Sequence, residues 1–477
     1  MIPKRSFSVF AFIYIALAAM SNEIDSTLFR KSFSDISSLG LPVVVIETVN
    51  DEFPFFELAE KENPDIMWGT GITNTNKVPG RLFIYENGKK VFDSGEYVEK
   101  VSGMTIKIRG NVSAANHDKK PYKIKLQSKA DLLMRGKQFS DKNWLLIKDN
   151  NLNAKIGFKV NEFVGMQWTP SYRYVNVMFN GRYFGVYMLC ESVCRNPGSR
   201  LDVSKSGYVF EWDTYWWNNH KYVESSFSSP LKYTFKYPDE DDITEEQIRY
   251  MQDEVFKAET SLSQGSYPEY IDVESFAAWI LAHDILGTWD AAGSNYFLTK
   301  YDDTSDSKIM MANLWDLETN FRRINQWSTA HLAGWFFYES LFDNINKAFI
   351  KEYKEKWENI KDALFNNIII FLDNYLSSEE CEQLNASIEL DNSLWGTEWK
   401  TAEVSIKDAK KWFVDRKDWL NNEMAKISID TNATAIKEMI KDNNPRYGSY
   451  NLNGISIERP PKDGMVIEKG GKYLRRR

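Results

Sequence analysis

The sequence predicts an α+β protein in which a β-rich N-terminal half precedes an α-rich C-terminal half. Short β-branched and aromatic runs separated by Asn-Gly turns occur before residue 190, and apolar residues at helical spacing dominate from about residue 348 to residue 424. The chain has 477 residues, 43% of them apolar, so it can bury one large core or two to three smaller ones.

Apolar or alternating runs bounded by turn residues predict the strands of the first half. Asn87-Gly88 and Asn180-Gly181 each stand between two such runs, which is a strong local signal for a hairpin. The strands predicted in this way lie at 41–48, 81–85, 90–92, 104–109, 122–126, 174–179 and 183–189.

Helical periodicity begins within the first half and dominates the second. Thr244-Glu245-Glu246-Gln247 fits a capping box, and apolar residues continue that helix to Leu262. The segment at 275–286 is apolar on all sides and predicts a buried helix. The other helical segments lie at 153–163 and from about 348 to 424.

Both ends of the chain have the character of targeting segments. Residues 1–20 have a basic start, an apolar run and small residues before Ser21, which predicts a signal peptide; a buried first helix or a membrane anchor is the alternative. The apolar run is short for a bilayer span, so we expect no stable membrane span and a secreted or cell-surface protein. Residues 445–477 resemble the β-hairpin sorting tails of proteins that Bacteroidetes export through an outer-membrane secretion system; a frayed basic end is the alternative.

Charge and cysteine content exclude two classes of protein. A net charge of −8 gives no footprint for nucleic acid, and an anionic ligand would need a local cluster of Lys and Arg. Cys190, Cys194 and Cys381 are too few for a disulfide scaffold. The Cys190–Cys194 spacing could form half of a metal site, but the four histidines supply no second half, so buried residues with at most one bond are the favoured interpretation.

An ordered series of acids and amides follows the predicted helix at 275–286. Asp290 and Asn295 are five residues apart, and a strand, an acidic turn and a second apolar run at 307–314 then lead to Asp316. Protein kinases place their groups in this order: an Asp that accepts the hydroxyl proton, an Asn that holds Mg²⁺, and a further Asp that holds metal. Glu318 would face the same side as Asp316 in an extended chain. Each acid alone could be a cap or a turn residue, but the series predicts a phosphoryl-transfer site with Asn295, Asp316 and Glu318 on the metal.

Candidate phosphate-binding cations lie in the first half. Arg109 ends one predicted strand, and Lys123 shares a face of the next strand with Lys125. Glu191, at the end of the strand at 183–189, could pair with one of these cations. Alternating lysines can equally form a solvated face. The chain has no Gly-x-Gly-x-x-Gly loop and no Walker motif, which argues against an ordinary protein kinase or a P-loop enzyme.

These motifs together resemble the CotH (spore coat protein H) kinase family, and in particular its secreted Bacteroidetes-type members. The likeness covers roughly residues 40–345, as a core continued by a helical part at 346–427, and rests on the stretches 108–111, 120–126, 131–133, 143–146, 179–191, 207–211, Asn295 and Trp315-Asp316. The resemblance implies an atypical protein-kinase-like fold that uses ATP and a divalent metal, Mg²⁺ or Mn²⁺, to phosphorylate Ser or Thr of exported proteins.

The resemblance also assigns roles to single residues. It implies that Asp290 is catalytic, that Asn295 and Asp316 bind metal with support from Glu318, and that Arg109, Lys123 and Glu191 occupy the basic and acidic positions around the nucleotide. One difference concerns the residues around Asp316: relatives often have Trp-Asp-Phe-Asp, whereas this chain has Trp315-Asp316-Leu317-Glu318.

Two other functions fit the same residues. One is a non-catalytic secreted or surface binding protein on the kinase fold, which would engage polysaccharide through aromatic side chains such as Trp212, Tyr215, Trp216 and Trp217, although core packing is the commoner fate of such residues. The other is an enzyme that uses ATP to transfer AMP to protein.

Overall fold

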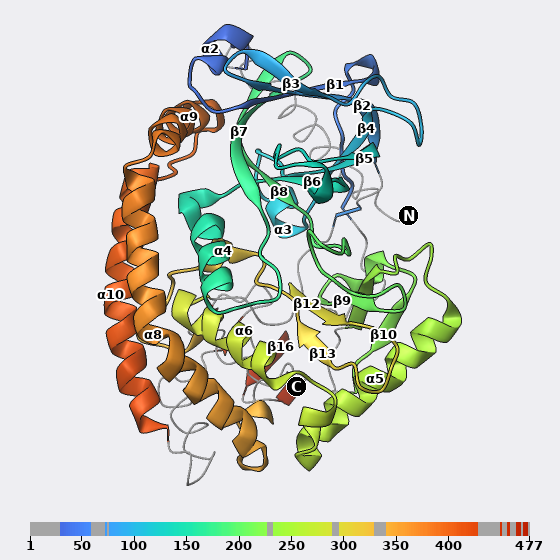
Figure 1. Ribbon diagram of the computed structural model, residues 1–477, viewed down its shortest axis with the longest axis vertical. Coiled ribbons are helices and arrows are strands. Elements are labelled where there is room, and N and C mark those ends of the chain that lie inside the picture. Colours follow the sequence, from blue (N-terminus) through green and yellow to red (C-terminus); the bar gives the residue numbers. More distant parts are fainter. Residues whose placement is uncertain are drawn as a thin grey trace, which may run out of the picture.

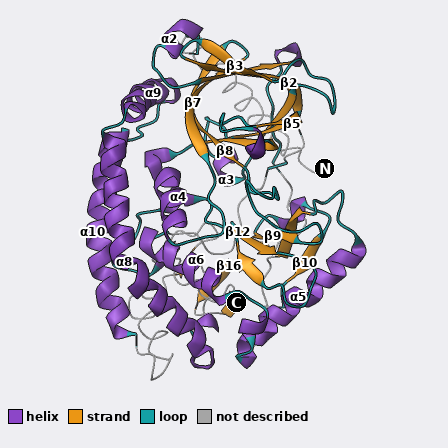
Figure 2. Ribbon diagram, in the orientation of Figure 1, coloured by secondary structure: helices purple, strands orange, loops and turns teal. Residues whose placement is uncertain are grey.

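The computed structural model describes residues 29–58, 72–73, 76–226, 232–288, 295–328 and 340–427, together with four short strands between residues 449 and 475. An N-terminal β-barrel forms one end of the molecule, and a second sheet and most of the long helices form the other (Figure 1). The predicted α+β class, with strands concentrated in the first half and helices in the second, is confirmed (Figure 2).

The N-terminal sheet closes on itself. Its order is β1-β7-β8-β6-β5-β4-β2-β3, and an additional pairing joins β1 to β2. All pairs are antiparallel except β1 with β7. Its strands are β1 (Val43–Thr48), β2 (Val78–Glu86), β3 (Lys89–Asp93), β4 (Met104–Ile108), β5 (Tyr122–Ala130), β6 (Asp141–Ile147), β7 (Tyr172–Phe179) and β8 (Arg182–Glu191).

Alternation along each strand fills the barrel. In β5, for example, Tyr122, Ile124 and Leu126 point into the interior, whereas Lys123 and Lys125 point out. Both predicted hairpins are present: Asn87 and Asn180 adopt φ angles of 50° and 48°, as a turn with the twist of the flanking strands requires. Short helices α2 (Phe33–Ser37) and α3 (Val112–Ala115) accompany the barrel.

A second, antiparallel sheet lies below the barrel in the view of Figure 1. Its order is β10-β11-β9-β12-β13. The strands are β9 (Tyr208–Asp213), β10 (Tyr222–Glu224), β11 (Lys232–Tyr237), β12 (Tyr296–Lys300) and β13 (Ile309–Met311). The apolar run predicted as a strand at 307–314 is therefore a strand only over its central residues.

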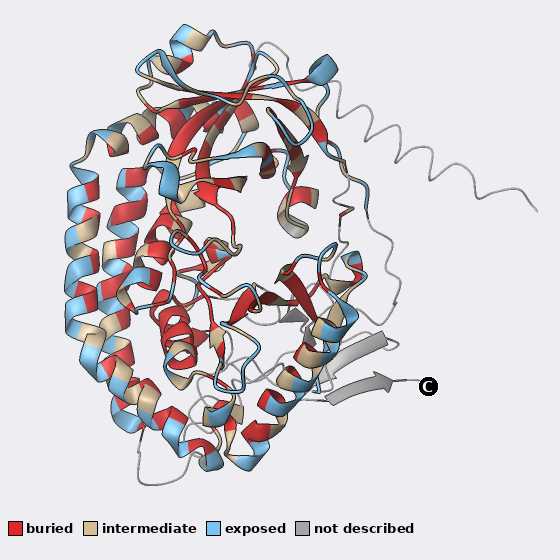
Figure 3. Cartoon of the chain, turned by 45° about the vertical axis from the view of Figure 1, so that its right-hand side comes forward, coloured by how far each residue is buried: buried red, intermediate tan, exposed pale blue. Residues whose placement is uncertain are grey.

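The long helices follow the predicted segments. They are α4 (Asn153–Phe163), α5 (Glu245–Gln264), α6 (Val273–Leu286), α8 (Lys347–Leu376), α9 (Glu379–Trp395) and α10 (Ala402–Lys426). Thr244 and Gln247 form the predicted capping box of α5. Almost all of α6 is buried, because α4, α8, α10 and β13 surround it (Figure 3).

Single-turn 3-10 helices connect these elements. They lie at Val49–Asp51, Lys137–Phe139, Asn150–Leu152, Trp216–Asn218, Tyr267–Glu269, Leu317–Thr319 and Asn344–Asn346.

Short strands mark the end of the chain. β16 (Gly464–Glu468) and β17 (Gly471–Arg475) pair as an antiparallel hairpin, and β14 (Ser449–Tyr450) pairs with β15 (Ser456–Ile457). The predicted signal peptide at 1–20 lies outside the described residues. Among the residues that are described, no helix combines the length and the apolar character needed to cross a membrane.

All three cysteines have free thiols, and Cys190 and Cys381 are buried, as the interpretation as core residues predicted. Within the described ranges, no three His, Cys, Asp or Glu side chains gather as a metal site.

Candidate functional site

The second sheet brings Asn295 and Asp316 together. Asn295 directly precedes β12, and Asp316 follows the strand that pairs with it, so the hairpin returns the chain to the same end of the sheet. The side-chain amide of Asn295 donates a hydrogen bond of 3.1 Å from Nδ2 to Oδ2 of Asp316. Both residues adopt left-handed backbone angles, with φ of 65° and 53°. Asp290, the predicted catalytic acid, lies outside the described residues.

Glu318 is close to Asp316, but not in the way that the sequence predicted. Asp316 is the N-cap of the 3-10 helix at 317–319, so the chain turns at this point and is not extended. The condition under which the two carboxylates would face the same side, an extended chain, is therefore not met. The two carboxylates are nevertheless close enough for the charge of Glu318 to raise the pKa of Asp316.

Two neighbouring carboxylates make this end of the sheet suited to a cation. Asp316 is exposed at the surface, but partial desolvation by the protein around it, followed by repulsion from Glu318, raises the pKa of its carboxyl to about 6, while Arg109, the Asn295 amide and Lys148 act in the opposite direction. A divalent cation would relieve the repulsion between the two carboxylates. Carboxylate and amide oxygens are the ligands that Mg²⁺ prefers, so the residues present fit the metal that the sequence predicted.

Helix α4 contacts residues 314–318, the segment that carries Asp316 and Glu318 and is called the metal loop below. The contacts are spread along the whole helix. Asn161 accepts the backbone N–H of Leu314 at 2.7 Å, and Asn153 donates to the carbonyl of Glu318 at 2.9 Å. Between them Gly157 lies against Leu317, so close that a Cβ at position 157 would stand 2.4 Å from Leu317 Cδ1. The turn that carries Asp316 and Glu318 is thus fixed by its packing against a helix.

Basic side chains from the barrel gather on the other side of the site. Lys107 of β4 and Lys123 of β5 are directly paired neighbours, and both project outward from the barrel wall. Burial, followed by repulsion from neighbouring cations, lowers the pKa of each to about 8; the first of these cations is Lys123 for Lys107 and Lys236 for Lys123. Arg109 follows β4, and its guanidinium carbon lies 5.9 Å from the ring centroid of Trp315. Like charges held side by side are unfavourable on a sheet, and a bound anion would offset their repulsion.

The second sheet adds one cation to this group. Lys236 of β11 repels Lys107, Lys123 and Arg109, which places it among them. Its ammonium is held 2.8 Å from Glu211 of β9. Burial lowers the pKa of Lys236, but its neighbouring carboxylates outweigh that effect and raise it overall. The site is therefore formed where the barrel faces the second sheet, with cations from both.

Comparison with protein families agrees with this arrangement. The model of the family described as "CotH kinase protein" matches residues 106–444, which is more than two thirds of the chain. The chain belongs to the CotH kinase family. The match begins later and ends later than the range of 40–345 expected from the motifs, and it includes α8, α9 and α10.

Comparison with solved structures also finds similar chains, among them a kinase. The crystal structure of a Helicobacter pylori proinflammatory kinase, CtkA, is matched over 77% of this chain and 99% of that chain, with 10% sequence identity and a TM-score of 0.25. No curated protein sequence matches the chain.

Lys148 is a further cation of this CotH-family site that the sequence did not single out. It follows β6 and is 8% exposed, and its ammonium has no hydrogen-bond partner in the part of the chain that the structure describes. Burial lowers its pKa, and the carboxylate of Glu318 partly offsets that effect. A single Lys after an apolar strand is a weak signal in sequence, because only the fold shows which carboxylates it approaches.

Glu191 does not pair with Arg109 or Lys123. It lies at the end of β8, fully buried, with Oε1 2.8 Å from Arg135 and 3.7 Å from Nε of Arg200. It also accepts the backbone N–H of Ser171. The predicted ion pair is wrong, because other arginines surround the carboxylate of Glu191.

The aromatic cluster proposed for polysaccharide binding is largely part of the core. Trp212 is fully buried and stacks between Tyr233 and Tyr296, and Trp217 is 8% exposed. Trp216 is half-buried and already contacts the ammonium of Lys232, 4.1 Å from its ring centroid. Only part of the expected surface is therefore presented to solvent.

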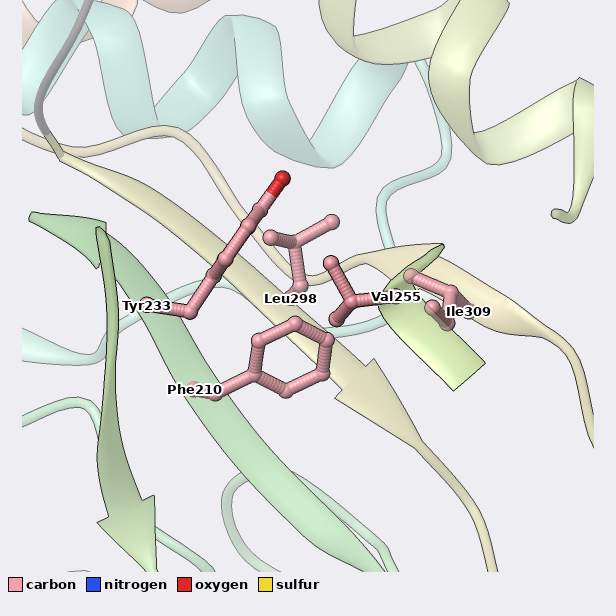
Figure 4. A pocket seen from close by; sticks show the side chains of 5 residues that line it. All are labelled: Phe210, Tyr233, Val255, Leu298 and Ile309. Carbon is pink, nitrogen blue, oxygen red and sulfur yellow. The ribbon is translucent and has the colours of Figure 1, made fainter. Parts of the chain in front are cut away.

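One small space beneath the second sheet is apolar. It is lined by side chains from β9, β11, β12, β13 and α5, namely Phe210, Tyr233, Val255, Leu298 and Ile309 (Figure 4). The hydroxyl of Tyr233 donates to Glu259 at 2.9 Å and is thus already satisfied. The space is part of the core between the sheet and α5, and its lining offers nothing to bind phosphate.

The chain that follows the metal loop is held by two helices. Arg416 of α10 is fully buried and donates to the carbonyls of Asp284, Arg323 and Ile324 at 2.7, 3.0 and 2.6 Å. The carboxylate of Asp284, on α6, accepts the backbone N–H of Ser328 at 2.8 Å. Residues 323–328 are thereby tied to the helical part of the molecule.

Proposed function

We propose that this protein is a metal-dependent atypical protein kinase that transfers the γ-phosphoryl group of ATP to Ser or Thr hydroxyls of proteins outside the cytoplasm. One observation carries the proposal: the contact between Asn295 and Asp316, with Glu318 beside it, faces the cations of the barrel wall across the site. Membership of the CotH kinase family supports the same reaction class.

The cations on the barrel side of the site are suited to binding the phosphates of ATP. Arg109, Lys107 and Lys123 would bind the phosphates, because the three cations lie close together and a bound anion would offset the repulsion among them. Lys148, buried and without a hydrogen-bond partner in the described chain, would add a contact next to Glu318. Phosphoryl transfer depends mainly on such positioning and charge neutralisation.

Asn295, Asp316 and Glu318 would hold the metal. When bound, the metal supplies positive charge to the phosphate oxygens as the bond to the leaving group breaks. Asp290 would orient the acceptor hydroxyl and take its proton as the oxygen–phosphorus bond forms. The two products are a phosphorylated Ser or Thr side chain and ADP.

Label transfer from ATP tests this function directly. The purified protein would be incubated with ATP labelled on the γ phosphate, with Mg²⁺ or Mn²⁺, and the label followed into added protein and into the enzyme itself. Asp316→Asn keeps the shape of the side chain but removes its charge, and should reduce transfer by about a hundredfold or more.

The strand β5 offers a matched control for the phosphate cations. Lys123 and Lys125 project from the same face two residues apart, but Lys125 is exposed whereas Lys123 is half-buried beside Lys107. Lys123→Ala should raise the KM for ATP, and Lys125→Ala should not. Equal effects of the two variants would disprove the phosphate assignment.

Three other outcomes distinguish the alternatives. Label that reaches protein only from the α phosphate would indicate AMP transfer. A protein that transfers no label and whose melting temperature does not respond to nucleotide would be a binding protein without catalysis. Normal transfer by Asp316→Asn would leave the activity standing and refute the metal assignment.

Export is part of the proposal and has its own test. The motivating feature is the basic, apolar and small-residue sequence at 1–20. Fractionation of cells that express the full chain should place the protein in the culture fluid or on the cell surface. Retention of the full-length chain in the cytoplasm would contradict it.

A further inference from the structure

A chain of buried side chains connects two helices to the metal loop. His283 Nδ1 lies 3.0 Å from the hydroxyl of Thr288, which donates to Oδ1 of Asn320 at 3.1 Å. Nδ2 of Asn320 donates to the carbonyl of Asn153 at 3.1 Å, and Nδ2 of Asn153 donates to the carbonyl of Glu318 at 2.9 Å. The series therefore runs from α6, through the residues after α6 and after the metal loop, to α4 and back to the metal loop.

Proton positions along this chain are determined by the groups themselves. The hydroxyl of Thr288 has one proton, and it is donated to Asn320. The hydroxyl can then only accept from His283, so Nδ1 of that imidazole carries the proton. Burial lowers the pKa of His283 to about 3, which keeps the ring neutral. In each hydrogen bond of the series, the donor and the acceptor are thus determined.

Burial makes the series costly to break. His283, Thr288 and Asn320 are 2%, 1% and 4% exposed, and Asn153 is 8% exposed. A buried polar group that loses its partner bears its full desolvation cost. The positions of these side chains are therefore coupled, and a shift of one residue is opposed by the others.

Backbone contacts run beside the side-chain series. Phe321 donates its N–H to the carbonyl of Leu286 at 2.8 Å, and the hydroxyl of Ser328 donates to the carbonyl of Thr288 at 2.6 Å. The chain that leaves the metal loop is thus bound directly to the chain that leaves α6. Thr288 precedes Asp290 by two residues, and Asn320 follows Glu318 by two.

We propose that Thr288 and Asn320 are positioning residues for phosphoryl transfer. Their hydrogen bond holds the chain that leaves α6 at Thr288 in a fixed register with the turn that carries Asp316 and Glu318. This inference rests on the proposed kinase function. It assigns neither residue a contact with ATP, metal or protein substrate; both act through the loops that they join.

A pair of substitutions at one position tests the inference. Thr288→Val keeps the shape of the side chain and removes the hydroxyl, whereas Thr288→Ser keeps the hydroxyl. We expect Thr288→Val to reduce kcat by about tenfold, to leave the KM for ATP within about twofold of wild type, and to raise the Mn²⁺ concentration for half-maximal rate by about threefold or more. Thr288→Ser should keep kcat and the Mn²⁺ concentration for half-maximal rate close to those of wild type.

Two further variants separate positioning from stability. Asn153→Ala, which removes the donor to Glu318, should reproduce the higher Mn²⁺ requirement with a smaller fall in kcat. Thr260→Val removes a hydroxyl that bonds within α5, far from the series, and should leave kinetics and metal requirement unchanged. Mn²⁺ binding in the presence of ATP, followed by electron paramagnetic resonance, provides a readout that does not depend on turnover.

The outcomes for the two proposals differ. An active wild type whose Thr288→Val variant keeps its kcat and Mn²⁺ requirement would overturn the positioning role alone. A fall in kcat matched only by a smaller folded fraction, with unchanged Mn²⁺ binding, would also overturn it. A wild type that neither binds Mn²⁺ with ATP nor transfers phosphate would refute the kinase function and this inference together.

Discussion

Gly157 controls how closely helix α4 approaches the metal loop, and its substitution should separate activity from stability. In Gly157→Ala the new Cβ would stand 2.4 Å from Cδ1 of Leu317 and 3.1 Å from Cδ2 and Cγ. Carbon atoms attract at about 3.5–4.0 Å, so Leu317 must move by roughly 1 Å. Leu317 is buried and stands between Asp316 and Glu318 in the sequence, so its displacement should be passed on to them.

The expected change in stability is small, because two effects oppose each other. Inserting a methyl group into a packed core typically costs about 1–3 kcal/mol. Replacing Gly by Ala in a helix interior gains about 1 kcal/mol. The free energy of unfolding should therefore fall by roughly 0–2 kcal/mol, which leaves a protein of ordinary stability almost entirely folded. A displacement of about 1 Å at a catalytic group, by contrast, can cost about a hundredfold in rate.

Kinetics and melting temperature measured on the same sample test this reasoning. Gly157→Ala should lower kcat by about a hundredfold and raise the metal requirement, while its melting temperature shifts by only a few degrees. Leu317→Val shortens the displaced side chain, so the double variant should regain much of the lost rate. A Gly157→Ala protein with wild-type kcat and metal requirement would show that the close approach does not position the loop.

Four other predictions concern charged residues that are buried or half-buried. Lys148→Met removes an ammonium without a hydrogen-bond partner in the described chain, so the melting temperature should rise while the Kd for nucleotide, measured by calorimetry, increases about tenfold or more. The pKa of Lys123 is lowered from 10.5 to about 8, so affinity for ATP should fall as pH rises through that value. The stability of the ligand-free protein should instead rise between pH 8 and 10.5, where the unfolded chain binds more protons. Asp391→Asn removes the carboxylate that pairs with buried Lys119 and should cost about 3–5 kcal/mol in urea unfolding.

Each of these predictions has a matched control. Lys125→Met, on the exposed part of β5, should change neither stability nor nucleotide affinity. Lys123→Arg keeps its charge at alkaline pH, so its affinity for ATP should depend less on pH. Lys119→Met combined with Asp391→Leu removes both charges and should recover part of the lost stability. Nucleotide affinity unchanged in Lys148→Met would remove that residue from the site.

Local signals predicted the fold class and most of the elements. The hairpins at Asn87-Gly88 and Asn180-Gly181 were correct, because the turn itself selects residues that adopt left-handed angles. The capping box at Thr244 was correct for the same reason: cap and acceptor lie three residues apart. Closure of the barrel was beyond such reasoning, since it depends on β1 pairing with both β7 and β2.

The site was predicted in part, and its gaps share one physical cause. Sequence order placed Asn295 and Asp316 at the two ends of a hairpin, and the structure brings them within hydrogen-bond distance. Lys107, Lys236 and Lys148 were missed, because their approach to the site depends on strand pairing and on the packing of the barrel against the second sheet. The extended arrangement of Glu318 failed because tertiary contacts hold Asp316 in a left-handed turn.

The hydrogen bonds from Arg416 to the carbonyls of Arg323 and Ile324 have a consequence for when, during synthesis, the protein can become functional. A ribosome completes Asp316 a hundred residues before it reaches Arg416. Until then, the carbonyls of Arg323 and Ile324 lack the guanidinium that holds them in the finished protein. A nascent chain that has not yet reached Arg416 would therefore have the described residues of the site without the contacts that align them, and catalytic competence would be acquired only after α10 has been synthesised.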